Sequence, residues 1–416
     1  MKELLKNRVF LIVQGADLLQ QIGIWTRNMA LLFYIMERTN NNPTAVSLLT
    51  TLEYLPIFIF SLIGGTYADR WNPKKTVVYG DALSALSMLL ILILISNGVW
   101  QSVFAATVIS AIISQFSQPS SAVIYKKHIP VNLVGSAIGI SQSLMAIFTI
   151  LGPVLGTFIY TQLGLETSIW VLFAIFTLAS GLQLFLPKTE KNKSKQETKS
   201  ALIDVKEGLV YVFKHNNLKY IACLFLIVGL SFGITQPLDV FVIMERLGLP
   251  KESVQWFAAA EGIGMLLGGG LAVTLSSFVE KYSKYVLTTT IVVLSLITII
   301  EILSFWPLLT AAARILSGLS AAFFQVIFST MMMKEVASDY IGRTNGIIMP
   351  LMMAGMLLGS ASSGFIVLKV DLFGAYVLSA ILTLSCIILT SRLQLEKVEL
   401  RTKPIRYKKG NGKYSN

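Results

Sequence analysis

The sequence is poor in the residues that soluble enzymes use for chemistry. It contains two cysteines and two histidines in 416 residues, and 13% of its residues are charged, about half the usual soluble share. Cys223 and Cys386 both fall in apolar stretches, which argues against a disulfide framework. The patterns GxxxxGK[ST] and HExxH and any cluster of Cys and His are absent. We therefore expect neither an enzyme nor a metal site.

Apolar residues, in contrast, are abundant and make up 54% of the sequence. Apolar runs of about 20 residues recur along the chain, and each is long enough to cross a bilayer as a helix. We predict an all-α membrane protein with twelve transmembrane helices. The predicted spans are 10–36, 45–66, 75–97, 101–125, 132–162, 166–186, 219–244, 252–275, 285–304, 307–333, 342–368 and 372–391.

The chain also carries an internal repeat. The tetrapeptide Ile35–Arg38 recurs as Ile243–Arg246, and at the same offset of 208 residues Glu53 is matched by Glu261. At an offset of 207 residues, Gln118, Gly135, Gly139, Gly152 and Phe158 recur as Gln325, Gly342, Gly346, Gly359 and Phe365. A register held over most of each half indicates two homologous six-helix repeats, the parallel plan found in some transporters.

Basic residues predict the orientation. With both termini on the cytoplasmic side, all but six of the 34 Lys and Arg residues fall on that side, as the positive-inside rule expects. The exceptions are Arg38, Arg246, Lys251 and Lys369 outside, and Arg27 and Arg314 within spans. These basic residues fix the topology beside anionic lipid and account for the net charge of +12, so we expect no nucleic-acid partner.

Composition divides the chain into four parts. We expect an N-terminal six-helix bundle over 1–186, a cytoplasmic linker over 187–216, a C-terminal bundle over 217–392 and a basic tail over 393–416. The linker is rich in Lys, Glu, Ser and Thr, and its end is amphipathic, which predicts a short helix on the membrane face.

The loop after the second span holds the sharpest motif. The run Gly65–Lys75 resembles the GxxxDRxGR[KR] signature of the major facilitator superfamily. We expect Asn72, where the family has Gly, to adopt the left-handed conformation of a tight turn. Asp69 is suited to meet a helix N-terminus or a cation and thereby to hold the two halves together on the cytoplasmic side. The alternative is that the basic residues of this loop only fix the topology. The residues assigned to this gating motif are Gly65, Asp69, Arg70, Lys74, Lys75 and Asp81; for Asp81 we favour structural support through pairing with the basic loop.

A second motif lies in the fifth span. Gly152-Pro153-Val154-Leu155-Gly156 resembles the GPxxG core of antiporters in the same superfamily, although the family's following Gly is Thr157 here. A proline and small residues in a membrane helix give a tight but bendable contact. In the eleventh span Ser360 replaces the proline, so we expect a kink in the first half only.

Together these features resemble a drug:proton antiporter of the major facilitator fold. The run from Gly65 to Asp81 and the Glu37-Arg38-Thr39 end of the first span resemble the bacterial macrolide-efflux group most, while siderophore and metal exporters of that group look similar. The resemblance implies a multi-pass protein of a bacterial cell membrane. It also implies a monomer that needs no cofactor beyond a proton gradient.

Carboxylates within apolar spans are candidates for function, because an unpaired charge there is costly. Glu53 and Glu261 lie near mid-depth of their spans. In the first span Gln14, Asp17, Gln21, Trp25 and Asn28 share one helix face, which predicts a cavity wall with Asp17 as a proton or cation site. We expect Arg27 to pair with an acid on another span. The alternative for each acid is a hydrogen-bonded structural role.

The second half offers its own charged residues. Gln236 and Asp239 share a face of the seventh span, and Arg314 opens an RxxxG element that the superfamily normally carries in its fourth span. We expect Arg314 to hold Glu261 or Asp239 ionised, and Gln325 to face the cavity.

The function we predict is the export of an amphipathic small molecule in exchange for protons by alternating access. Few polar groups are expected in the cavity, which favours a lipophilic substrate. The alternatives are an exporter of a siderophore or metal complex, a proton-coupled importer of a small nutrient, and a membrane scaffold or receptor without transport.

Overall fold

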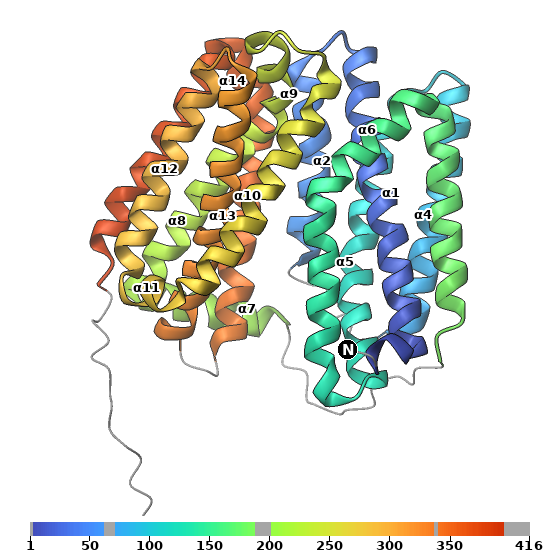
Figure 1. Ribbon diagram of the computed structural model, residues 1–416, viewed down its shortest axis with the longest axis horizontal. Helices are drawn as coiled ribbons and strands as arrows, with labels where there is room; N and C mark the ends of the chain where they lie inside the picture. The colour runs from blue at the N-terminus through green and yellow to red at the C-terminus, as the bar shows by residue number, and fades with distance from the viewer. Residues whose placement is uncertain (1–2, 62–70, 188–200, 337–339, 395–416) are drawn as a thin grey trace, which may run out of the picture.

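The computed structural model describes residues 3–61, 71–187, 201–336 and 340–394, and every regular element in these ranges is a helix. The long helices stand side by side and run the full height of the molecule (Figure 1). Their bounds are α1 Arg8–Arg38, α2 Pro43–Ser61, α4 Pro73–Ser96, α5 Ser102–His128, α6 Val131–Leu184, α7 Ala201–Lys214, α8 Asn216–Thr235, α10 Val254–Thr274, α11 Ser276–Lys281, α12 Ser283–Leu303, α13 Pro307–Glu335 and α14 Ile341–Arg392.

The described residues form twelve spans, which confirms the predicted fold class. Eight helices are long and apolar enough to cross a membrane. Two of these, α6 and α14, are each a pair of spans joined at a sharp break, where Gly164 has a φ of 70° and Asp371 a φ of 58°. The more polar helices α1 and α5 complete the twelve. Their polar side chains line the cavity described below, which explains their composition.

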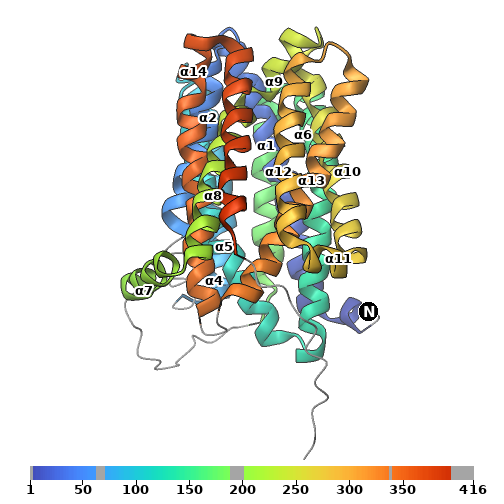
Figure 2. The same cartoon turned by 90° about the vertical axis from the view of Figure 1, so that its left-hand side faces the viewer.

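The helices form two bundles, α1–α6 and α8–α14, which lie beside each other (Figures 1 and 2). The first helix begins and the last helix ends at the same end of the molecule, which also holds α7 and α11. We call this end the terminal side and the opposite end, where α1 ends at Arg38, the far side. The terminal side is the one that the sequence predicts to be cytoplasmic.

Asparagine side chains cap the first turns of α1 and α4. The side chain of Asn7 accepts hydrogen bonds from the backbone N–H groups of Val9 and Phe10, at 2.9 and 3.1 Å, and caps α1. Asn72 caps α4 in the same way by accepting from the N–H of Lys75 at 3.2 Å, and Pro73 occupies the first helical position. Asn72 is extended, with a φ of −76°, so the predicted left-handed turn at this residue is wrong. Capping, and not positive φ, explains an asparagine there.

The seventh span is irregular where the sequence places Asp239. Helix α8 ends at Thr235 and is followed by a 3-10 turn, Gln236–Leu238, one α-helical turn, Asp239–Phe241, labelled α9, and a π-helical turn, Val242–Arg246. Pro237 has no N–H to donate, which breaks the regular ladder. Irregular turns of this kind inside a helix often mark functional sites, because they redirect side chains.

Small residues bring helices of the same bundle into close contact. A side chain at Gly152 or Gly156 of α6 would meet Trp25 of α1. In the second bundle, Gly355 and Gly359 of α14 pack against the backbone of α8 in the same way. Gly152 and Gly359 are equivalent in the repeat, so the repeat conserves the same close contact in both bundles.

The two bundles touch on the far side. One apolar cluster contains Met36 and Val46 of the first bundle together with Leu238, Leu372 and Tyr376 of the second. The clusters that lie nearest the terminal side each belong to a single bundle. Among the described residues, the molecule is therefore closed on the far side, and its halves are separate on the terminal side.

An ion pair ties the halves together on the far side. Lys251 Nζ lies 2.7 Å from Glu37 Oε1, and the hydroxyl of Tyr160 donates to Glu37 Oε2 at 3.1 Å. Lys251 also lies over the ring of Phe33, 5.9 Å from its centre. The lysine comes from the second half, whereas its two partners, Glu37 and Phe33, come from the first, so the contact must break when the far side opens.

We expect Lys251→Ala to shift the molecule towards far-side opening by about two- to fivefold, the worth of a partly exposed ion pair. The measurement is labelling of Thr44→Cys by an impermeant thiol reagent in a variant without Cys223 and Cys386, because Thr44 packs against Gly364 of the other half. Lys369→Ala is the control, since this lysine is exposed and has no ion pair in the described part of the chain. Equal labelling of all three proteins would contradict a role of the Lys251–Glu37 ion pair in closing the far side.

Candidate functional site: an acidic cavity and a buried arginine cluster

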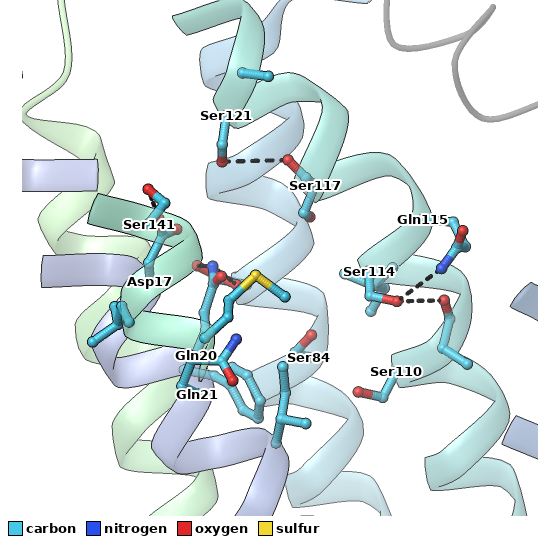
Figure 3. Close-up of a pocket in the computed structure, with 18 of the residues that line it drawn as sticks. Asp17, Gln20, Gln21, Ser84, Ser110, Ser114, Gln115, Ser117, Ser121 and Ser141 are labelled. Carbon is cyan, nitrogen blue, oxygen red and sulfur yellow. Dashed lines mark hydrogen bonds between the residues drawn. The ribbon is translucent and has the colours of Figure 1, made fainter. Parts of the chain in front are cut away.

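A cavity of about 450 Å³ lies in the first bundle, between α1, α2, α4, α5 and α6. This volume suits a drug-sized molecule. Its wall combines apolar side chains, such as Ile24, Ile57 and Phe176, with hydroxyl and amide groups. Figure 3 shows Ser114, Ser117 and Ser121 on one helix across from Gln20 and Gln21. Six serines and four glutamines of the described ranges line the cavity, many more polar groups than we expected from the sequence.

Asp17 points into this cavity without a cationic partner. It stands on α1, and Ser141 of α6 lies beside it (Figure 3), with its hydroxyl 3.5 Å from Asp17 Oδ2. Gln14, one turn earlier, donates to the hydroxyl of Tyr125 at 2.6 Å and also contacts Ser141. No ion pair among the described residues involves Asp17. Its weak hydrogen bonding leaves the carboxylate available to a ligand.

Asp81 lines the same cavity and is 3% exposed. Both of its oxygens accept from the amide nitrogen of Gln20, at 3.0 and 2.8 Å. We expected Asp81 to pair with the basic loop. Lys74 of that loop donates to the carbonyls of Leu184 and Leu186, at 2.8 and 2.5 Å, and Arg70 lies outside the described residues, so this pairing stays a prediction. In the described part of the chain, Asp81 therefore belongs to the cavity wall.

Arg27 and Glu53 meet at the deeper end of the cavity. Arg27 Nη2 lies 3.8 Å from Glu53 Oε1, and the same guanidinium binds Asn28 Oδ1 at 2.8 Å and contacts Ser110. The expected partner on another span is thus Glu53 of α2. Among the described residues, the cavity wall holds three carboxyl groups and one guanidinium, so it favours cations over anions.

A second charged site lies in the other bundle, around Arg314 of α13. Its guanidinium binds Asp239 through two hydrogen bonds, at 2.6 and 3.0 Å, and Glu261 through one at 3.3 Å. The hydroxyl of Tyr376 also donates to Asp239, at 3.0 Å. Arg314 Nε lies 2.9 Å from Glu301 Oε1. We call these five residues the arginine cluster.

Two members of the cluster escaped our sequence analysis. Glu301 lies two residues before the end of α12, where a lone charge is typical of a span boundary, and Tyr376 stands in an apolar stretch with no pattern around it. Both come from helices that reach Arg314 only through tertiary packing. The single signal was a glutamate flanked on both sides by isoleucine, since a charge within such a run is costly.

Glycine spacing positions Arg314. Gly318, one turn after Arg314, lies against the backbone of Glu261 and Met265 in α10, and Gly264 lies against the backbone of Ile315 in return. Each glycine permits an approach that a Cβ atom would prevent. The RxxxG spacing therefore brings Arg314 beside Glu261.

One hydrogen bond joins the two sites across the halves. The hydroxyl of Tyr54, the residue after Glu53, donates to Gln236 Oε1 at 2.8 Å, and Gln236 lies one turn before Asp239. Thr51 of the same helix bonds Ser360 of α14 at 3.2 Å. The contacts that close the far side therefore extend inward to the level of the Arg27–Glu53 pair and of the arginine cluster.

Other predicted site residues lie elsewhere. Gln325 is exposed and stands eleven residues after Arg314, about 16 Å along α13, so it does not join the cluster. Lys75 is exposed and uses its backbone N–H to complete the cap of α4. Gly65, Asp69 and Arg70 lie outside the described residues.

A family comparison decides the class of protein. The family model of the Major Facilitator Superfamily matches residues 18–300 and 221–413. The chain is a member of the Major Facilitator Superfamily. Its relatives include the "Uncharacterized MFS-type transporter YkuC" of Bacillus subtilis (strain 168), 26% identical over 366 residues and covering 84% of each chain. Macrolide efflux protein A of Streptococcus pyogenes is 21% identical over 386 residues, which are 90% of this chain and 93% of the relative.

Solved structures of this superfamily share the fold. The nucleoside transporter NupG has a TM-score of 0.75 at 15% identity, and the match covers 92% of this chain and 98% of that one. The D-xylose-proton symporter has a TM-score of 0.68 at 13% identity and covers 94% and 98%. At these identities the likeness concerns the fold alone. The chain is therefore a multi-pass transporter by family, and its chemistry must be argued from its own residues.

Proposed function

We propose that this transporter exports an amphipathic small molecule that carries a cationic amine, in exchange for protons. The observation that carries the proposal is the surplus of carboxyl groups in the cavity, where Asp17 has no cationic partner among the described residues. An amine placed there would form a charge-assisted hydrogen bond. The apolar wall, with Ile24, Ile57 and Phe176, suits the rest of such a molecule.

The closed far side suggests how transport proceeds. Substrate enters the cavity from the terminal side, which we place in the cytoplasm. The halves then rock about the level of Tyr54 and Gln236, the far-side contacts break, and substrate leaves. Protons move the opposite way on buried carboxyl groups, and no covalent bond is made or broken. The mechanism needs no cofactor, and we propose a monomer in a bacterial cell membrane with two six-helix halves, 1–186 and 217–392.

Import of a polar nutrient is the second candidate. The serines and glutamines of the cavity favour it, because a sugar or nucleoside requires many hydrogen-bond partners. The distant likeness to macrolide efflux protein A supports export instead. A substrate with both an amine and several hydroxyl groups would use both features of the wall.

A susceptibility panel tests the proposed direction. An efflux-deficient bacterial strain that expresses the protein is exposed to erythromycin, ethidium and a neutral antibiotic. We expect resistance to the two cationic compounds, and a protonophore should abolish it. Uptake of labelled nucleoside or xylose, with no change in resistance, would favour import and overturn the proposal.

A further inference from the structure

The arginine cluster is separate from the substrate cavity. Arg314 and its three carboxyl partners come from α9, α10, α12 and α13 of the second bundle, whereas the described cavity wall comes from the first. The arginine cluster therefore does not belong to the surface that we expect to contact the substrate. The buried charges still require an explanation, because structural stability alone is better served by apolar residues.

The cluster has more negative than positive charge. Asp239, Glu261 and Glu301 surround the single guanidinium of Arg314, which leaves an excess of two negative charges when all four side chains are ionised. Such an excess is strongly disfavoured in a medium of low dielectric constant. At least one carboxyl group must then bind a cation or a proton.

The arrangement excludes a metal ion as the natural occupant. The guanidinium already occupies the space between the carboxyl groups and would repel a second cation placed there. No group of three or more His, Cys, Asp or Glu side chains in the described ranges could hold a metal ion. A proton, which becomes part of a carboxyl group, has neither difficulty.

The three carboxyl groups differ in how well their charge is compensated. Asp239 accepts two hydrogen bonds from Arg314 and one from Tyr376, and Glu261 accepts one from Arg314. Glu301 Oε1 and Arg314 Nε are close, but both atoms are buried and lack an aligned hydrogen-bond partner. The side chain of Glu301 is 7% exposed, against 25% for Asp239 and Glu261. Burial and poor alignment both disfavour its charged form.

Glu301 also stands at the right depth to receive a proton. It lies two residues before the far-side end of α12, and Arg314 lies seven residues, about 10 Å, after the far-side start of α13. When the far side opens, this cluster is closer to the entering protons than Asp17 is. While the far side is closed, the bond between Tyr54 and Gln236 joins the helices that carry the cavity residue Glu53 and the cluster residue Asp239.

We propose that Glu301 is the proton-binding group of this transporter, with Arg314 as the residue that positions it and takes part of its charge when the proton leaves. Asp239 and Glu261 stay ionised as the standing partners of Arg314. Substrate and proton thus bind in different halves. The proton site itself follows from the cluster, while its use in exchange rests on the proposed function.

Infrared difference spectroscopy tests the site without any substrate. Purified protein in lipid is titrated from about pH 5 to about pH 9, and the C=O band of protonated carboxyl groups is followed. We expect a component of this band to vanish in Glu301→Gln, to shift in Glu301→Asp and to persist in Glu261→Gln. A spectrum of Glu301→Gln that matches the unaltered protein, or loss of the same component in Glu261→Gln, would overturn the assignment.

Transport in proteoliposomes tests the use of the proton, with ethidium as the probe. For one proton exchanged per ethidium, each unit of pH gradient should sustain about a tenfold accumulation. We expect no gradient-driven accumulation in Glu301→Gln, while exchange of labelled for unlabelled ethidium continues. Full gradient-driven accumulation in this variant would contradict the proposed role.

The two measurements separate the proposals. If the unaltered protein fails to accumulate ethidium but its infrared component depends on Glu301, the proposed exchange fails and the proton site stands. If accumulation occurs and the infrared component does not depend on Glu301, the exchange stands and the site fails. Gel filtration detects a loss of folding, since a folded Glu301→Gln variant elutes at the same volume as the unaltered protein.

Discussion

Replacement of Arg314 by glutamine should destabilise the protein by about 3–5 kcal/mol, the cost of removing one partner from a buried ion pair. The guanidinium is the single cation within 4 Å of Asp239, Glu261 and Glu301 in the described part of the chain. Without it, Asp239 keeps only the hydroxyl of Tyr376. Transport should be lost as well, because the helices α9, α10, α12 and α13 meet at this side chain.

Cys386 provides the measurement for this prediction. Its side chain is fully buried, so a thiol-reactive fluorophore labels it only as the protein unfolds on heating. A Cys223→Ser background isolates that signal. Arg27→Gln is the matched control, since Arg27 is equally buried but has one carboxylate partner, at 3.8 Å. We expect a smaller loss there, and the double variant Arg314→Gln with Asp239→Asn should recover part of the stability. Equal melting temperatures of Arg314→Gln and Arg27→Gln would contradict the expectation that Arg314 contributes more to stability than Arg27.

Asp17→Asn should weaken the binding of a cationic substrate about 10- to 100-fold, because a hydrogen bond to a charged group is worth about 1.5–3 kcal/mol. Asparagine has nearly the same shape, so the cavity should persist while its free negative charge disappears. The measurement is binding of erythromycin to the purified protein, followed by gradient-driven efflux from vesicles. Efflux should fall with binding.

Two controls sharpen this prediction. Erythromycin N-oxide lacks the cationic amine and should bind the unaltered protein and Asp17→Asn equally. Asp81→Asn removes a charge from the same cavity, but both oxygens of Asp81 already accept from Gln20, so a smaller effect is expected. Undiminished binding of erythromycin to Asp17→Asn would remove Asp17 from the recognition of substrate.

The stripe on the first span shows how far the sequence predicted the site. A shared helix face correctly associates Asp17 and Gln21, both of which line the cavity. It also includes Trp25, which packs between helices against Gly152 and Gly156. It omits Gln20, whose amide holds Asp81. Periodicity indicates which residues share a face but says nothing of which neighbour that face meets.

The pairing of the charged residues could not be predicted from the sequence, for a related reason. Glu53 and Glu261 are equivalent in the repeat, yet their arginines, Arg27 and Arg314, come from non-equivalent helices. Symmetry therefore predicts the two glutamates and not their partners. Glu301 was overlooked because a charge near the end of an apolar run normally faces water, and only the packing of α12 against α13 buries it.

Composition and periodicity by themselves determined the class, the twelve helices and the two-half plan, because the bilayer requires long apolar helices and the repeat is written in the chain. The tertiary structure alone decided which buried charges meet, which wall carries the hydroxyl groups and which side of the molecule is closed. The physical reason is that hydrophobicity acts residue by residue along the chain, whereas ion pairs and cavities depend on helices far apart in sequence.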